Sequence, residues 1–143
     1  MESKAKAQQR VAQLAAKDRF AHSMGVRFVD GGPGHAKVAM TVREQHLNFN
    51  GTCHGGAIFA FADAAFGLAS NSHGAIAAGI DAHITYQAAA VLGDELTASA
   101  IEVSRSRKLA VYRIDVTRAD GEMISCFTGT VYVTARHHDG GPG

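Results

Sequence analysis

The chain has 143 residues, which suits one domain with a substantial core and leaves little room for two. Hydrophobic residues make up 46% and charged residues 19%, a balance that excludes an intrinsically disordered chain. The 14 basic and 13 acidic residues give a formal charge of +1, so composition gives no support for a nucleic-acid partner.

Cysteine usage and hydropathy indicate the compartment. Two cysteines, Cys53 and Cys126, are too few for a disulfide framework and suit a reducing environment. No segment approaches the roughly 18 uninterrupted apolar residues that a membrane span needs, and residues 2–16 lack a signal-peptide-like apolar run. We therefore expect a cytoplasmic protein with no membrane partner.

The chain begins with residues 2–22, which are rich in Ala, Gln, Lys and Arg and have apolar side chains at helical spacing. This pattern predicts an accessory N-terminal helix within residues 1–23 that ends at Gly25. Two short strands are expected next, at 26–29 and 36–42, joined by a glycine-rich turn.

A polar loop at 44–52 precedes the one long apolar segment, residues 54–69. Its alanine content and length favour a helix, and Asn71 and Gly74 follow as termination signals. Because the segment is apolar around its whole circumference, we expect it to be buried on every side.

From Gly74 onward the pattern changes to period two. One face of the first strand is expected to carry Ile76, Ala78, Ile80, Ala82, Ile84 and Tyr86. Further strands are expected at 95–104, 109–118 and 123–134, and a disordered tail at 137–143. A single apolar helix and a run of antiparallel strands satisfy each other when the sheet curls around the helix, so we predict one α+β domain over residues 24–136.

Asp63 is the one carboxylate inside the apolar helix. Such a group is costly to bury unless it has partners or takes up a proton. It is therefore either a hydrogen-bonded structural residue or a functional acid.

The start of the helix favours the functional alternative. His54, Gly55 and Gly56 stand where the helix should begin, and the glycines leave backbone N–H groups unshielded. A helix amino terminus has unpaired donors and a partial positive charge, which suit the oxyanion that forms when a thioester is hydrolysed. A glycine pair that merely permits a turn is the alternative.

The spacing of Gly55 and Asp63 predicts a shared site. Eight residues of helix separate them by about 12 Å, too far for both to reach one carbonyl. Two antiparallel copies of the helix across a dimer axis could bring Gly55 of one chain to Asp63 of the other, which predicts an inactive monomer.

Other residues have weaker claims. Asn48 could orient water or the thioester, although a turn role is common for Asn, and His54 could lie near the oxyanion. Cys53 is the alternative nucleophile, but no base is apparent for it. The turn that contains Arg105, Ser106, Arg107 and Lys108 could bind phosphates or could simply be solvated. No metal-binding motif is present, so we expect no metal site.

The segments His46–Gly56 and Phe59–Phe66, with the Asn…His-Gly-Gly…Asp spacing, resemble the PaaI family of phenylacetate-degradation thioesterases. The wider resemblance, over about residues 24–134, is to hotdog-fold acyl-CoA thioesterases. It implies a long central helix wrapped by a curved antiparallel sheet of five to six strands, an acyl-CoA substrate, no cofactor, and a homo-oligomer in which two dimers with shared sites form a tetramer.

The resemblance also implies roles for single residues. Asp63 would be nucleophile or general base, the Gly55 N–H would polarise the carbonyl, and Asn48 and His54 would line the site. The turn at 105–108 would hold CoA phosphates. Phe59 and Phe66 could form walls around an aryl or hydroxyphenylacetyl group, or could pack in the core. Where many relatives have an arginine after the tyrosine, this chain reads Tyr86-Gln87-Ala88-Ala89.

Two other functions share these features. A hotdog hydratase or dehydratase would use a positioned His and acid pair on an acyl thioester. A non-catalytic acyl-CoA-binding module would share the fold and pocket but would not need a carboxylate in the helix.

Overall fold

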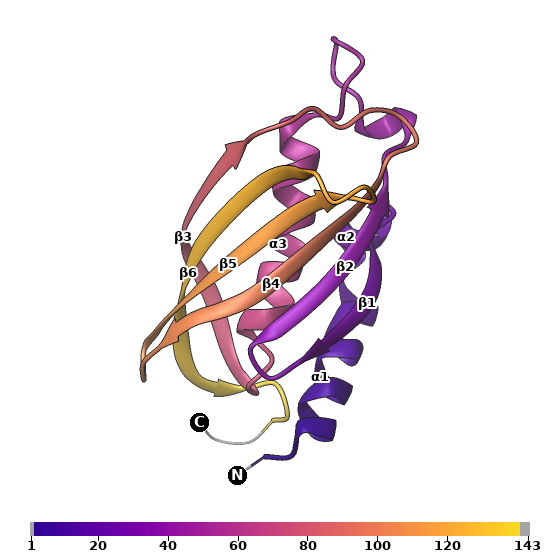
Figure 1. Cartoon of the computed structure of the whole chain (residues 1–143). Helices are drawn as coiled ribbons and strands as arrows, with labels where there is room; N and C mark the ends of the chain where they lie inside the picture. Colours follow the sequence, from indigo (N-terminus) through magenta and orange to yellow (C-terminus); the bar gives the residue numbers. More distant parts are fainter. Residues whose placement is uncertain (1, 141–143) are drawn as a thin grey trace.

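The computed structural model describes residues 2–140, and within them one six-stranded antiparallel sheet curves around a central helix (Figure 1). The elements in chain order are α1 (Lys4–Lys17), α2 (Arg19–Ser23), β1 (Arg27–Gly32), β2 (His35–Thr41), the 3-10 helix η1 (Glu44–His46), α3 (Gly55–Ser70), β3 (Ala75–Tyr86), β4 (Glu95–Arg105), β5 (Leu109–Arg118) and β6 (Met123–His137). The predicted hotdog architecture is confirmed. No helix among the described residues has both the length and the apolar character that a membrane crossing requires.

The sheet order is β1-β2-β4-β5-β6-β3, with every neighbouring pair antiparallel. Helix α3 packs on the concave side, against the central strands β2, β4 and β5. Its side chains Phe61, Ala62 and Ala65 are completely buried there. The alternation of apolar residues in β5 and β6 supplies the facing layer of the core.

The N-terminal segment forms two helices where one was predicted. Asp18 ends α1 and accepts a hydrogen bond from the Ala21 N–H at 3.1 Å, so it caps α2. An Asp at this position satisfies an otherwise unpaired helix donor and redirects the chain. Helix α1 buries Val11 so closely against β1 that a Cβ at Gly31 would lie 2.5 Å from it. The accessory helix is therefore part of the core.

Helix α3 is not buried on every side, which corrects the expectation. Gly56, Asp63 and Gly67 are exposed along one face, while the opposite face is buried. The sheet wraps only part of the helix circumference, and α1 and α2 cover only another part. One stripe of α3 thus remains open in the single chain.

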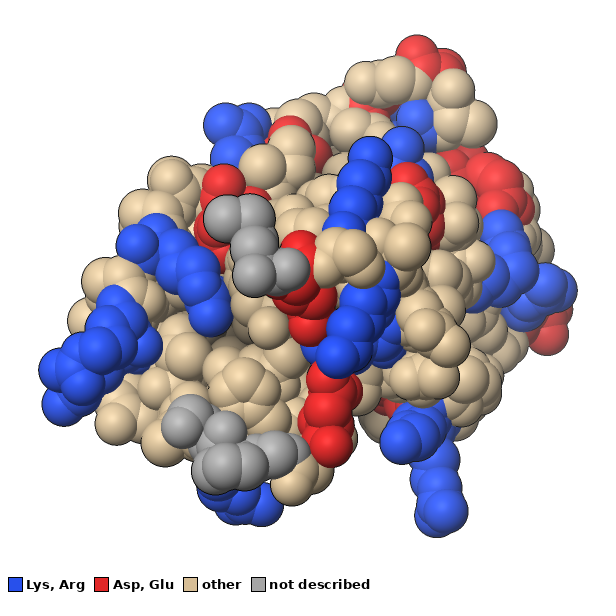
Figure 2. Space-filling view, turned by 90° about the horizontal axis from the view of Figure 1, so that it is seen from below, with Lys and Arg blue, Asp and Glu red and all other residues tan. Residues whose placement is uncertain are grey.

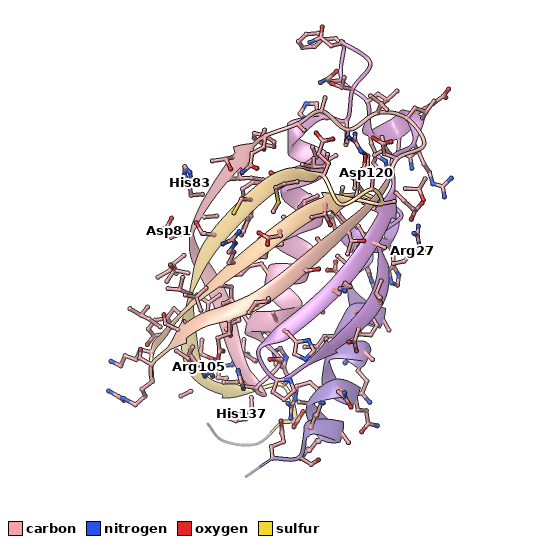
Figure 3. All side chains as sticks on the ribbon, viewed as in Figure 1. Arg27, Asp81, His83, Arg105, Asp120 and His137 are labelled. Atoms are coloured by element: carbon pink, nitrogen blue, oxygen red, sulfur yellow. The ribbon has the colours of Figure 1, made fainter. Side chains whose placement is uncertain are left out.

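The predicted faces of β3 are wrong in its first half. A β-bulge places Gly79 opposite Val131 and Asp81 opposite Thr130, so one extra residue, Ile80, has no partner in the ladder. Before the bulge Ala77 and Gly79 face the core, and Ile80 is 60% exposed. After it the predicted alternation holds. Asp81 and His83 point away from the sheet at this free edge (Figure 3).

The C-terminal residues differ from the expected disordered tail. His137 ends β6, the His138 ring bonds the Asn71 Oδ1 at 2.7 Å, and Asp139 forms a 2.8 Å ion pair with the buried Arg10. Arg10 also donates to the Ser72 carbonyl at 2.8 Å. These contacts join α1, the end of α3 and the end of β6. Residues 141–143 lie outside the described residues.

Two glycines make room for the Phe66 ring under the sheet. A Cβ at Gly129 would lie 2.6 Å from that ring, and one at Gly79 would lie 3.2 Å from it. We predict that Gly129→Ala lowers the free energy of unfolding by about 1–3 kcal/mol through overpacking, measured by urea denaturation. Combining it with Phe66→Leu should cost less than the sum of the two single changes. Strict additivity would contradict this packing.

Candidate active site

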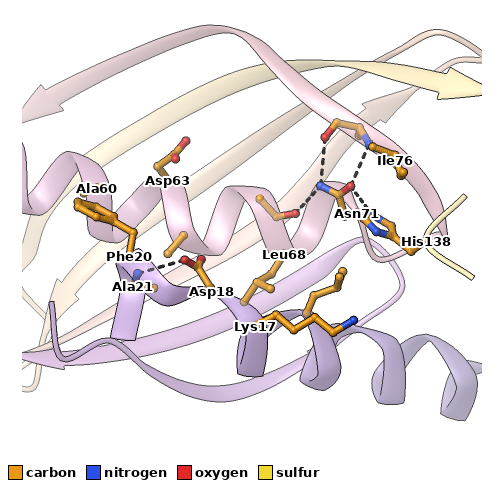
Figure 4. A pocket seen from close by; sticks show the side chains of 14 residues that line it. Lys17, Asp18, Phe20, Ala21, Ala60, Asp63, Leu68, Asn71, Ile76 and His138 are labelled. Carbon is orange, nitrogen blue, oxygen red and sulfur yellow. Dashed lines mark hydrogen bonds between the residues drawn. The ribbon is translucent and has the colours of Figure 1, made fainter. Parts of the chain in front are cut away.

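Asp63 lies on the exposed stripe of α3 and lines a cleft of about 540 Å³ between α3, the α1–α2 connection and the start of β3 (Figure 4). The lining is mainly apolar, and its polar members besides Asp63 are Lys17, Asp18, Asn71 and His138. Among the described residues, the Asp63 carboxylate has neither a hydrogen-bond donor nor an ion-pair partner. Within residues 2–140, no hydrogen bond holds this carboxylate in the way that the structural alternative requires.

The surroundings of Asp63 raise its pKa above the ordinary carboxyl value. Desolvation by the cleft wall raises the pKa of Asp63 although the side chain is exposed in the single chain, and the negative charge of Asp18 raises the pKa further. A raised carboxyl pKa in a cleft is typical of a group that exchanges protons in catalysis.

The amino terminus of α3 lies in a second cleft, of about 340 Å³, lined by Gly55, Ile58, Cys53 and the segment 86–90. The His54 Nδ1 accepts a hydrogen bond from the Gly56 N–H at 2.7 Å and so caps the helix. The Gly55 N–H, by contrast, donates to no acceptor within residues 2–140. It is a free donor at the positive end of the helix dipole.

Tyr86 fixes the other side of Gly55. Its hydroxyl donates to the Gly55 carbonyl oxygen at 2.9 Å, and a Cβ at Gly55 would lie 3.2 Å from the tyrosine ring. A side chain at position 55 would therefore crowd the tyrosine ring, which would have to shift by a few tenths of an ångström. The segment Gln87-Ala88-Ala89 lines this same cleft.

Cys53 does not have the properties of a nucleophile. It is buried just before α3, and burial raises the pKa of its thiol to about 11. The thiolate would be scarce at neutral pH, and within the described part of the chain no base accompanies the thiol.

Asn48 organises the loop before α3. Its side-chain oxygen accepts from the Asn50 N–H at 2.8 Å and the Thr52 N–H at 3.2 Å. These bonds are those of a turn residue, the alternative that the sequence left open. The sequence analysis missed the role of His46, which is buried in the same loop. The His46 Nδ1 accepts a hydrogen bond from the Arg43 N–H at 2.9 Å, and its Nε2 lies 2.7 Å from the Met24 carbonyl oxygen.

Phe59 and Phe66 occupy the core and line neither cleft. The Phe59 ring packs edge-on against Phe127 at 5.2 Å, and the Phe66 ring contacts Tyr112 at 6.0 Å and Phe127 at 5.5 Å. Core packing, the alternative considered for both, is what the structure shows. Their contact with substrate stays a prediction.

The basic turn between β4 and β5 lies at the end of the sheet that Figure 1 places at the lower left, and Lys and Arg side chains gather at the matching edge in Figure 2. Ser106 closes the turn through hydrogen bonds with Leu109, and Arg105 lies 3.7 Å from Glu102. Arg107 and Lys108 are exposed and form no ion pair with any described residue.

The family model of the thioesterase superfamily matches residues 50–125, a stretch that includes both Gly55 and Asp63. The chain belongs to this family. It is 33% identical to the acyl-coenzyme A thioesterase PaaI of Escherichia coli, over 87% of this chain and 89% of the relative. The chain is accordingly a thioester hydrolase.

Comparison with solved structures supports the same family assignment. The E. coli PaaI protein from the phenylacetic acid degradation operon superposes with a TM-score of 0.91 at 30% identity, covering 95% of this chain and 99% of that one. A hypothetical thioesterase protein from Streptococcus pneumoniae, solved with coenzyme A, gives a TM-score of 0.81 at 27% identity over 87% of this chain and 98% of its own.

Asp18 should influence the pH dependence of the site. Because its charge raises the pKa of Asp63, we predict that Asp18→Asn moves the acid limb of the kcat/KM profile to lower pH. Asn retains an oxygen to accept from the Ala21 N–H. Asp120→Asn, the same charge change in the exposed β5–β6 turn, should leave the limb in place. A limb unmoved by Asp18→Asn would remove this coupling.

Proposed function

We propose that the protein hydrolyses an aryl or phenylacetyl-CoA thioester to the free acid and CoA. The observation that supports this most is the unpartnered Asp63 carboxylate in a largely apolar cleft, on a chain of the thioesterase family. An apolar cleft suits an uncharged acyl group. The coenzyme A in the S. pneumoniae neighbour and the substrate class of E. coli PaaI support CoA as the thiol part.

The chemistry follows from two groups. The free Gly55 N–H donates to the thioester carbonyl oxygen and stabilises the negative charge that develops there. Asp63 either accepts a proton from an attacking water or attacks the carbonyl carbon itself and forms a mixed anhydride that water then hydrolyses. In both routes the carbon–sulfur bond breaks and the CoA thiolate takes up a proton. Single-turnover reaction in ¹⁸O-labelled water distinguishes them, because label enters Asp63 only when its carboxylate attacks.

The two groups are proposed to come from different subunits. Within one chain they line separate clefts and lie about 12 Å apart along α3. Three features support a second copy across this face: the exposed stripe of α3, the free edge of β3, and Phe49, which is 98% exposed at the tip of the loop before α3. Small residues on α3 would let two antiparallel copies approach closely. Pairing of such dimers into a tetramer stays a prediction.

The basic turn is proposed to bind CoA phosphates. Arg107 and Lys108 are exposed and free of ion pairs among the described residues, whereas Arg105 is partly engaged by Glu102. Guanidinium and ammonium groups with the Ser106 hydroxyl suit phosphate oxygens. Since Gln87-Ala88-Ala89 offers no cation, this turn would carry more of the phosphate contact.

Replacing the carboxylate tests the central role of Asp63. We predict that Asp63→Asn lowers kcat by orders of magnitude and changes KM little, because an amide neither accepts the proton nor attacks. Thiol release from phenylacetyl-CoA measures this. Near-normal turnover would exclude Asp63 from the mechanism.

The Gly55 donor can be removed without losing the helix start. Gly55 is the first residue of α3 and His54 has φ −60° and ψ 135°, both compatible with proline at position 55. We predict that Gly55→Pro lowers kcat about 100-fold to 1,000-fold. Gly55→Ala, which meets Tyr86 equally but keeps the N–H, should lose far less.

The same variants test the sharing of the site. Co-expressed Asp63→Asn and Gly55→Pro chains should regain about a quarter of the wild-type activity, because half of randomly formed dimers are mixed and each mixed dimer has one intact site. Sites built within single chains would show no recovery.

A further inference from the structure

Phe20 is a large aromatic residue that the fold leaves 65% exposed on the short helix α2. A single exposed apolar side chain is ordinary on a protein surface. This one, however, lines the cleft that contains Asp63, and among the described residues it is the one Phe, Tyr or Trp in that lining. In Figure 4 its ring lies toward the Ala60 end of the cleft, the same end as Asp63.

The position of Phe20 is set by the break between α1 and α2. Asp18 accepts from the Ala21 N–H, and Ala21 is buried against the core, with 7% of its surface exposed. The Met24 N–H donates back to the carbonyl oxygens of Phe20 and Ala21, at 3.2 and 3.1 Å. The backbone that carries Phe20 is thus anchored on both sides, while the ring itself extends into the cleft.

The opposite end of the cleft is closed by groups that are already paired. The Asn71 amide donates to the carbonyl oxygens of Gly67 at 2.8 Å and Ala77 at 3.2 Å, and its oxygen accepts from the Ala77 N–H at 2.9 Å. The His138 ring completes this set. These side chains form a fixed wall and have little capacity left for a ligand.

We propose that Phe20 is a specificity-determining residue that stacks on the acyl part of the thioester and selects a neutral aromatic group. The proposal rests on the hydrolytic function proposed for Asp63. Between the fixed wall and the reacting carboxylate, the lining offers mostly small or aliphatic side chains, so Phe20 supplies the aromatic surface. A ring of the substrate would pack against it edge-on or offset, at a contact worth more than its apolar area alone.

The charged residues that line the cleft limit which acyl groups it can accept. Asp18 and Asp63 line the same cleft, and a second carboxylate on the acyl group would meet both. Lys17 is the cation in the lining, and it belongs to the α1 end. Dicarboxylic acyl groups such as succinyl are therefore disfavoured relative to phenylacetyl.

Phe20 comes from the N-terminal helices and not from the part of the chain that the family model matches. The thioesterase family model begins at residue 50, so both proposed reacting groups lie within it and Phe20 lies outside. Helices α1 and α2 would thus add acyl selectivity to a reaction performed by the shared part of the fold.

The test compares Phe20→Ala and Phe20→Leu with wild type on phenylacetyl-CoA and butyryl-CoA. Loss of the ring should lower kcat/KM for phenylacetyl-CoA about 10-fold to 100-fold in Phe20→Ala, and butyryl-CoA should change less than about threefold. Phe20→Leu keeps the apolar bulk and guards against a folding defect, so it should lower the phenylacetyl-to-butyryl ratio by a smaller factor. Tyr132→Ala, an exposed aromatic residue on the outer face of the sheet, should leave the ratio unchanged.

A ratio that stays constant in both Phe20 variants, while wild type hydrolyses the thioesters, would overturn the role of Phe20 and leave the hydrolytic function standing. If wild type hydrolyses neither thioester, the hydrolytic proposal fails instead. In that case, calorimetric measurement of phenylacetyl-CoA binding to Asp63→Asn chains with and without Phe20→Ala tests the role of Phe20. Weaker phenylacetyl-CoA affinity after Phe20→Ala would support stacking, and unchanged affinity would overturn it.

Discussion

The proposed site depends on one constraint: the carboxylate and the amide donor that we propose to act on one carbonyl are fixed on a single rigid helix. A helix rises about 1.5 Å per residue, so Asp63 and Gly55 cannot approach each other by any local rearrangement. In the single chain one face of α3 is uncovered, and Asp63 lies in one cleft while Gly55 lies in another. In the assembly proposed here, a second chain supplies what the first lacks.

Much of the architecture could be predicted because its signals are local. The apolar length of α3, the period-two strands and the turn residues between them all depend on neighbours in sequence, and the expected elements appear within a few residues of their observed bounds. The errors arise where tertiary packing decides. The bulge at Ile80 follows directly after Gly79, which lies with Gly129 against the Phe66 ring, and no local pattern in β3 encodes that ring.

The residues of the candidate site also form two groups, those that can be recognised in the sequence and those whose role depends on the fold. Asp63 and Gly55 stand out in the sequence because an acid in an apolar helix and a glycine pair at its start are unusual in themselves. Asp18 and Phe20 do not stand out, since their importance comes only from lying across a cleft from α3. Conversely, Phe59 and Phe66 have the right chemistry for a substrate wall, but the curvature of the sheet turns them into the core. All three residues are phenylalanine, so only their positions in the fold distinguish Phe20 in the cleft from Phe59 and Phe66 in the core.

This division has a physical consequence for how selectivity can change. The proposed reacting groups are held by α3, whose burial under the sheet makes its geometry costly to alter. The cleft wall opposite Asp63 is built from α1 and α2, which are joined to the rest through Arg10 and buried side chains such as Val11 and Ala21. Substitutions on the exposed face of α2 disturb little core packing, whereas substitutions along α3 would disturb the reaction itself. A hydrolase built this way can change its acyl preference at Phe20 while the carboxylate and the amide stay where the helix holds them.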